Sequence, residues 1–297
     1  MHNYFDYSPE IEQAIGDRQP ILALESTILT HGLPYPENLN TAYHLENIVR
    51  KLGAVPATIA VMDGQLKIGL TEYELERLVS EKNVVKVSRR DLPFAVSQKL
   101  TAGTTVAATV FAAYNAGIRV LATGGIGGVH RGNEFDISAD LLELSRNPIA
   151  VVCSGAKAIL DIPKTLEYLE TFSVPVIGYR TSVFPAFYTA KTNNKIPSVA
   201  SLEELIKLLE AHRALDSLAS VLIANPIPNE NELSSEEVEP AIMEALAQAE
   251  EQSINGKAIT PFLLQALTAA TAGKSLQANL KLIESNVRLG AKIAANL

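Results

Sequence analysis

The stretch VVCSGAKAILDIPKTLEYLE (residues 151–170) places an apolar run, a polar loop and a helix-prone segment in direct succession. The run is apolar at consecutive positions, which is typical of a strand that is covered on both faces. Lys157 lies in the loop between the strand and the helix-prone segment. A lysine there is either a solvated charge, the more common case, or an amine held in a pocket for chemistry.

The same order recurs along the chain. The expected strands are ILAL (21–24), TIAVM (58–62), VVKV (84–87), RVLATG (119–124), IAVVC (149–153), VPVIGY (174–179) and VLIAN (221–225). Helices are expected after capping boxes that begin at Thr71, Ser201 and Ser234, over residues 104–117, and from residue 276 to the C-terminal end. This alternation predicts an α/β protein with a largely parallel central sheet, in a single domain over residues 1–297.

Composition and charge exclude several classes of protein. The formal net charge of −8 disfavours binding to nucleic acid, which needs a field of Lys and Arg. The single cysteine, Cys153, leaves no disulfide framework and no cysteine-based zinc site. No secretory signal is present, and no apolar run reaches the roughly 18–20 residues that span a bilayer. We therefore expect no membrane contact and a location in the cytoplasm, with an organelle as the remaining alternative.

Ligands of such sheets bind beyond the carboxyl ends of the strands, so the residues there are candidates. Glu25 directly follows ILAL, where partial desolvation would raise its pKa and suit it to proton transfer. The alternative is an exposed Glu25 beside a helix cap at Ser26 or Thr27. Lys86 interrupts an apolar strand, so it must reach solvent or an anion, or lose its charge.

Two further stretches carry candidate ligands. GGIGGVHRG (124–132) exposes backbone N–H groups and ends in cations that suit a phosphate, although sharp turns also need glycine. It lacks the spacing of a Walker A loop or a dinucleotide fingerprint. In FDISADLLEL (135–144), Asp136 and Asp140 would point the same way at a helix start and suggest Mg²⁺ or Mn²⁺. The alternative is that one of them, or Ser138, caps the helix.

Taken together, ten stretches resemble the pseudouridine-5′-phosphate glycosidases, in order from about residue 20 to near the C-terminus. They are ALESTILTHGLPYPENL, KVSRRDLPF, TTVAAT, RVLATGGIGGVHRG, FDISADL, CSGAKAILD, TLEYLETF, NPIP, ITPFLL and GKSLQANLKL. The resemblance implies a three-layer α/β/α fold, a homotrimer, and one divalent ion per subunit, Mn²⁺. It also implies reversible cleavage of the C–C bond of pseudouridine 5′-phosphate, which gives ribose 5-phosphate and uracil.

The resemblance further implies roles for individual residues. Glu25 would be the proton donor, Lys157 the covalent nucleophile and Asp136 the metal ligand. The implied substrate contacts are Lys86, Val106, His130, Ser138, Ala139, Asp140 and Asn279, with His130 and Asn279 on the phosphate. The sequence departs from some relatives just before FDIS, where NE (133–134) replaces a longer spacing.

In the expected reaction the leaving atom is a carbon, C5 of uracil. A pair of carboxylates alone is poorly suited to break such a bond. Protonation of the ring oxygen by Glu25 would open the ribose, and Lys157 would join C1′ as an iminium. Uracil would leave after protonation at C5, and water would release the sugar phosphate. Two alternatives remain open: another Schiff-base lyase on a phosphosugar, such as an aldolase, and a non-catalytic sensor of sugar phosphates. A nicotinamide dehydrogenase is the least supported, because its glycine spacing is missing.

Overall fold

The computed structural model describes residues 4–132, 135–254, 256 and 259–297. The centre of its main sheet consists of seven strands in which every neighbouring pair is parallel. In spatial order they are β3 (Val55–Met62), β2 (Ile21–Leu24), β7 (Val120–Ala122), β9 (Ala150–Cys153), β13 (Val221–Ala224), β11 (Val176–Tyr179) and β12 (Ser198–Val199). This order confirms the predicted parallel sheet.

Shorter strands extend one side of the sheet. β5 (Val85–Val87) confirms the predicted strand VVKV (84–87), whereas three others were not predicted: β1 (Phe5–Tyr7), β4 (Gln65–Ile68) and β6 (Ala102–Thr104). β4 and β6 run antiparallel to β3, whereas β1 runs parallel to β4 and β5 runs parallel to β6. A separate antiparallel pair, β8 (Val129–His130) and β10 (Leu160–Asp161), lies next to the loop that holds Lys157.

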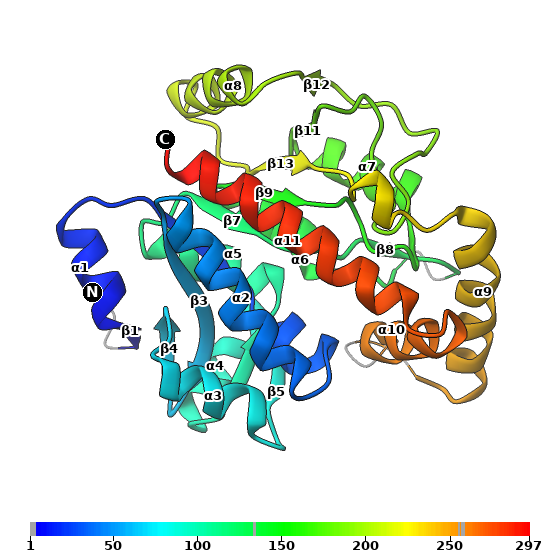
Figure 1. The fold of residues 1–297 in the computed structure, drawn as a ribbon, viewed down its shortest axis with the longest axis horizontal. Helices are drawn as coiled ribbons and strands as arrows, with labels where there is room; N and C mark the ends of the chain where they lie inside the picture. Colours follow the sequence, from blue (N-terminus) through cyan, green and yellow to red (C-terminus); the bar gives the residue numbers. More distant parts are fainter. Residues whose placement is uncertain (1–3, 133–134, 255, 257–258) are drawn as a thin grey trace.

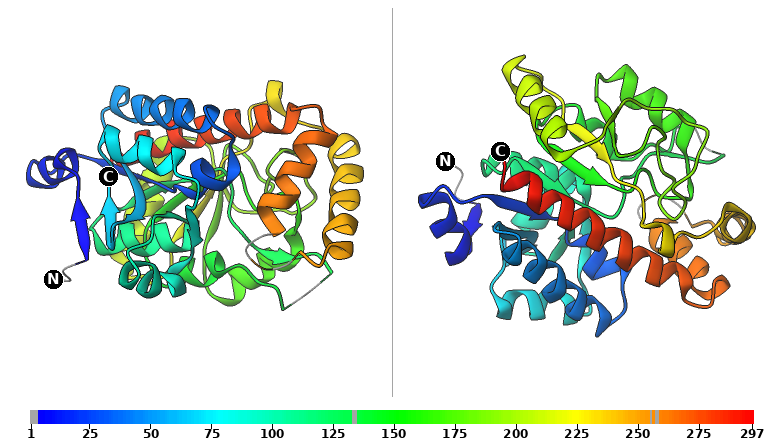
Figure 2. Two further views of the ribbon diagram at one scale, coloured as in Figure 1. Left: turned by 90° about the horizontal axis from the view of Figure 1, so that it is seen from below. Right: turned by 45° about the horizontal axis from the view of Figure 1, so that its top comes forward.

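Helices cover both faces of the sheet, which confirms the three-layer α/β/α fold (Figures 1 and 2). α2 (Glu37–Lys51) and α11 (Lys274–Ala294) pack together on one face. On the other face lie α4 (Leu92–Ser97), α5 (Val106–Asn115) and α6 (Ala139–Leu144). The remaining helices are α1 (Pro9–Gly16), α3 (Glu72–Ser80), α7 (Ile162–Thr171), α8 (Leu202–Ala214), α9 (Ser235–Glu251) and α10 (Ile259–Ala270).

The helix starts follow the predicted caps. Thr71 and Glu74 form a complete capping box at α3, in which each residue accepts a hydrogen bond from the backbone N–H of the other. Ser201 and Ser234 cap α8 and α9 through their hydroxyl oxygens. α5 ends just before Gly117, whose φ of +79° is the left-handed conformation that glycine adopts readily.

α9 and α10 pack on each other at the end of the molecule where the parallel strands terminate (Figure 1). All four residues of β9 and of β13 are buried, as expected for strands with both faces covered. These rigid strands fix the positions of the loops that follow them. Within the described part of the chain, no helix combines the length and apolar character needed to cross a membrane.

Candidate active site

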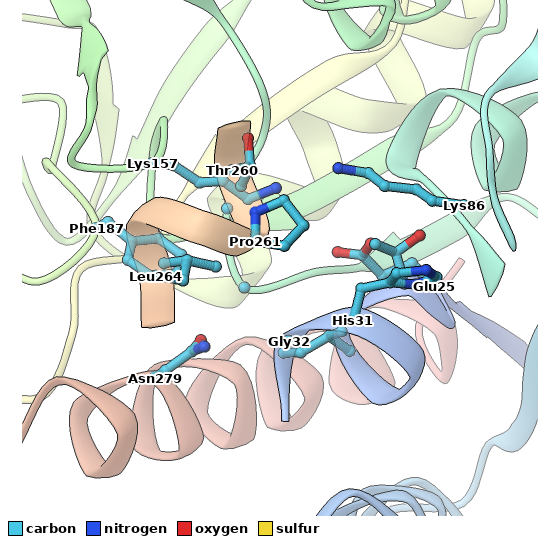
Figure 3. Close-up of a pocket in the computed structure, with 14 residues that line it drawn as sticks. Glu25, His31, Gly32, Lys86, Lys157, Phe187, Thr260, Pro261, Leu264 and Asn279 are labelled. Atoms are coloured by element: carbon cyan, nitrogen blue, oxygen red, sulfur yellow. The ribbon is translucent and has the colours of Figure 1, made fainter. Parts of the chain in front are cut away.

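A pocket lies beyond the carboxyl ends of the parallel strands, between α10 and α11 (Figure 3). It contains about 450 Å³ of empty space, part of which is open to solvent. Four of the residues implied by the resemblance line it: Glu25, Lys86, Lys157 and Asn279. They come from four separate segments of the chain, so only the fold brings them together.

Glu25 is the first residue after β2 and is 7% exposed. The Thr123 hydroxyl, just beyond the neighbouring strand β7, donates a hydrogen bond to Oε1 of Glu25. Burial raises the pKa of Glu25, against the opposing effects of the Lys157 charge and the Thr123 hydrogen bond. A raised pKa keeps the proton on this carboxyl at higher pH, which suits a general acid. The sequence-based interpretation of Glu25 as a desolvated carboxylate is confirmed, and the exposed alternative is wrong.

The loop that holds Lys157 is pinned against the glycine-rich stretch. The Ile126 N–H donates to the Gly155 carbonyl at 3.0 Å, and the Lys157 N–H donates to the Ile126 carbonyl at 3.1 Å. Gly155 has a φ of +81°, and a Cβ there would lie 1.9 Å from the Pro185 carbonyl oxygen. Only glycine therefore fits this tight crossing, which directs the Lys157 side chain into the pocket.

Lys86 reaches the same space from β5 on the other side of the pocket, so the two amino groups point toward one another in Figure 3. Both lysine residues are half-buried. Their charges also act on Glu25 and His130, because both lysines shift the pKa values of those groups. The pocket thus gathers one carboxyl group and two amino groups.

Asp140 is buried, and both of its oxygens are used by the protein. Oδ1 accepts from the Ala107 N–H at 2.8 Å, and Oδ2 accepts from the Gly127 N–H at 2.8 Å. The carboxylate therefore ties the first turn of α5 to the glycine-rich stretch. Its charge still reaches the pocket, since it contributes to the raised pKa of Glu25.

The predicted pairing of Asp136 and Asp140 on one helix face is wrong. Ser138 is the N-cap of α6, and its Oγ accepts from the Asp140 N–H at 3.2 Å. The helix therefore begins at Ala139, and Asp136 precedes it in an extended segment. The alternative, in which Ser138 caps the helix, is confirmed. Ala139 is exposed at the first helical position. The NE stretch (133–134) before it lies outside the described residues.

His130 lies in β8 beside Asp136, whose carbonyl accepts from the His130 N–H at 2.9 Å. Burial lowers the pKa of the His130 ring, and the Asp136 charge opposes this effect. Its buried Nδ1 atom has no hydrogen-bond partner among the described residues. Val106 is 1% exposed, so only its backbone, at the start of α5, could face a ligand. Asp136, His130, Ser138, Asp140 and Val106 do not line the pocket of Figure 3.

The resemblance assigns the metal ion to Asp136, so the surroundings of this residue are a test of fit. It is half-buried, and among the described residues no cluster of three or more His, Cys, Asp or Glu side chains could bind a metal. A single carboxylate fits a hard cation such as Mn²⁺ or Mg²⁺ that keeps several waters and completes its shell with substrate oxygens.

The sequence reasoning missed His31 and Thr123. His31 lines the pocket from a π-helical turn, η1 (Ile28–Gly32), six residues after Glu25. Its Nδ1 lies 2.7 Å from the Thr30 hydroxyl, and burial, with a further effect of the Lys86 charge, lowers its pKa. Such π-helical turns often occur at functional sites, but their presence is visible only in the structure. One feature of the sequence could have indicated Thr123, because it is a polar residue directly after the strand β7.

A buried polar network joins α11 to three strand ends. The Asn286 Nδ2 donates to the Thr123 carbonyl at 2.8 Å, and its Oδ1 accepts from the Asn225 Nδ2 at 2.9 Å. The Ser154 hydroxyl donates to the Asn225 carbonyl at 2.9 Å. The network fixes the segments that hold Thr123 and Lys157, because these residues follow β7 and β9.

Known proteins are similar to this chain over nearly its whole length. Residues 10–296 match the family model described as "Indigoidine synthase A like protein". The pseudouridine-5′-phosphate glycosidase of Caldanaerobacter subterraneus is 53% identical to this chain, and the match covers 100% of this chain and 98% of the relative. The pseudouridine-5′-phosphate glycosidase of Staphylococcus aureus is 52% identical, and the match covers 99% of this chain and 97% of the relative.

Two solved structures share the fold, each with a TM-score of 0.91. An indigoidine synthase A (IdgA)-like protein from Thermotoga maritima is 35% identical and is matched over 100% of this chain and 97% of its own. The prealnumycin C-glycosynthase AlnA, in complex with ribulose 5-phosphate, is 39% identical, and the match covers 99% of this chain and 97% of the AlnA chain. The chain belongs to the indigoidine synthase A-like family that includes the pseudouridine-5′-phosphate glycosidases.

Proposed function

We propose that this chain is a pseudouridine-5′-phosphate glycosidase, which reversibly cleaves its substrate to ribose 5-phosphate and uracil. The relatives that are about half identical over the full chain carry this name, and AlnA, a C-glycosynthase, holds a pentulose phosphate. The observation that carries the proposal is the pocket itself. A buried carboxyl group whose pKa is raised and a half-buried lysine line one space at the carboxyl edge of the sheet.

The mechanism follows from these two groups. Glu25 gives its proton to the ring oxygen, so that the bond between this oxygen and C1′ breaks and the Lys157 amine bonds to C1′. The nitrogen of Lys157, now bonded to C1′, loses a proton, and C5 of uracil gains one; the nitrogen lone pair then forms the C1′=Nζ iminium as the bond from C1′ to C5 breaks and its electron pair stays on C5. Water then hydrolyses the iminium, which releases ribose 5-phosphate and restores the amine.

The remaining groups position the sugar phosphate. We propose that His130 binds the phosphate, because its Nδ1 is buried without a partner among the described residues, and that Ser138 contacts the substrate nearby. Mn²⁺ at Asp136, when bound, would orient and polarise a substrate oxygen. A homotrimer is the assembly that the resemblance to this family implies.

One experiment tests the activity directly. The protein is mixed with Mn²⁺ and pseudouridine 5′-phosphate, and free uracil is followed by ultraviolet absorbance after separation. We expect release of uracil in step with ribose 5-phosphate. Absence of uracil would reject the glycosidase, and a sugar phosphate that binds without turnover would instead support a sensor.

A second experiment tests the covalent step. Ribose 5-phosphate and borohydride should leave a stable adduct on Lys157, located by peptide mass spectrometry. Lys157→Ala should abolish both the adduct and turnover. Lys164→Ala, in the first turn of α7, is the matched control and should abolish neither. Full turnover in Lys157→Ala would reject the iminium. An adduct without release of uracil would indicate another Schiff-base lyase.

A further inference from the structure

Arg131 is one of the cations at the end of the glycine-rich stretch (124–132), where the sequence suggests phosphate binding. Its side chain is 28% exposed, and it is not one of the described residues that line the pocket. Nε donates to the Leu160 carbonyl at 3.2 Å, and Nη2 donates to the Ala158 carbonyl at 2.9 Å. Nη1 and Nη2 also donate to the carboxylate of Glu239 in α9. The protein itself therefore uses most of the N–H groups of this guanidinium and pairs its charge.

The two carbonyls that Arg131 binds belong to the turn that carries Lys157. The Leu160 N–H donates to the Lys157 carbonyl at 3.0 Å, so residues 157–160 form a tight turn. The Lys157 N–H donates to the Ile126 carbonyl at 3.1 Å, which fixes the start of the turn. The guanidinium then fixes the residues that follow, because it holds the carbonyls of Ala158 and Leu160 in one plane.

The segment that is proposed to bind the sugar phosphate is held without Arg131. The His130 N–H donates to the Asp136 carbonyl at 2.9 Å, and the Ser138 N–H donates to the Gly128 carbonyl at 3.0 Å. Neither hydrogen bond involves the guanidinium. Its loss would therefore loosen the turn that carries the nucleophilic lysine and leave the phosphate-binding segment in place.

We propose that Arg131 is a positioning residue that sets where the Lys157 amine meets C1′ of the sugar, and that it is not a phosphate ligand. This inference rests on the proposed glycosidase activity. A nucleophile attacks from about 3–3.5 Å, and a displacement of about 1 Å can lower the rate roughly 100-fold. Lysine cannot replace Arg131, because an ammonium is a point charge that lacks the planar fork needed for two carbonyls and a carboxylate.

Borohydride trapping of ribose 5-phosphate on Lys157 separates positioning from phosphate binding. The trapping rate at saturation reports the reactivity of the amine, whereas the half-saturating concentration of ribose 5-phosphate reports binding. In Arg131→Lys we expect the saturated trapping rate and the kcat for uracil release to fall about 10- to 100-fold. The half-saturating concentration should change by no more than about twofold. Arg77→Lys is the matched control, because the Arg77 side chain is 34% exposed and binds both carboxylate oxygens of Asp63; it should change neither value.

Two further variants complete the test. Arg131→Gln covers the case in which Arg131→Lys does not fold, and it should show the same lower rate with unchanged binding. Glu239→Gln keeps both bonds to the turn, so it should lower the saturated rate by less than about fivefold, as expected for an exposed ion pair.

Three results would overturn the proposal. The first is a higher half-saturating concentration at an unchanged saturated rate, which would make Arg131 a phosphate ligand. The second is a smaller final amount of adduct that still forms at the wild-type rate, which would indicate a role in folding alone. The third is a loss of rate in Glu239→Gln as large as that in Arg131→Lys, which would assign the effect to α9 rather than to the turn. A wild-type protein that forms no adduct and releases no uracil would instead overturn the glycosidase activity itself.

Discussion

Asn286 provides the sharpest test of how the fold supports the site. It lies within α11, is fully buried, and its amide hydrogen-bonds to the segments that follow β7, β9 and β13. Asn286→Ala removes these bonds in one step. Since Thr123 also donates to Glu25, we expect the substitution to lower both stability and turnover.

The size of the effect follows from the groups left behind. In the variant, the Asn225 Nδ2 still donates to the Ser285 hydroxyl at 3.1 Å, and the Ser154 hydroxyl still donates to the Asn225 carbonyl at 2.9 Å. The Thr123 carbonyl loses its 2.8 Å bond from Asn286. A buried group left unsatisfied costs about 1–3 kcal/mol, and the vacated volume adds roughly 1 kcal/mol. We therefore expect a loss of about 2–4 kcal/mol in the free energy of unfolding, out of the roughly 5–15 kcal/mol typical of proteins.

Urea denaturation followed by far-ultraviolet circular dichroism measures this loss. The control is Asn296→Ala, because the Asn296 Nδ2 makes an exposed hydrogen bond to the Lys292 carbonyl at 2.8 Å. Its removal should change the free energy of unfolding by less than about 0.5 kcal/mol. A loss in Asn286→Ala as small as that in the control would refute the reasoning. In that case, the network would not hold the strand ends.

Three further predictions concern the site. Burial raises the pKa of Glu25 above its ordinary 4.5, so ionisation above the folded-state pKa destabilises the fold, and this cost vanishes as the pH falls below 4.5. Glu25→Gln should therefore unfold at higher urea than the wild type at neutral pH but not in acid; equal midpoints at both would contradict this. Thr123→Val removes a hydrogen bond that lowers the pKa of Glu25, so the alkaline limb of the kcat profile should move to higher pH, and Thr123→Ser should restore it. An unmoved limb would show that Thr123 does not tune the acid. Chelation should abolish activity until Mn²⁺ is returned, and Asp136→Asn should raise the concentration of Mn²⁺ required; indifference to chelator would reject the metal.

The central strands were predictable because burial on both faces makes them apolar at consecutive positions. β4 was missed because it alternates instead: Leu66 and Ile68 are buried, whereas Lys67 is paired with Asp6 and Glu74 at the surface. The pattern over its four residues is too short to distinguish a strand from a turn.

The site was predictable where it depends on strand ends. Glu25 and Lys157 follow buried strands, so the topology of a parallel sheet places them at one edge. Spacing alone could not place Asp136, because the start of the helix depends on whether Ser138 or an aspartate forms the cap. His31 depends on a π-helical turn that has no signature in the sequence.

Two asparagine residues of α11 contribute to the site in different ways. Asn279 and Asn286 are seven residues apart, which is two helical turns, so they lie on the same face of the helix and both are buried. The protein satisfies the Asn286 amide with its own strand ends, whereas the Asn279 oxygen has no partner among the described residues. α11 therefore supports the strand ends of the site through Asn286 and lines the pocket through Asn279.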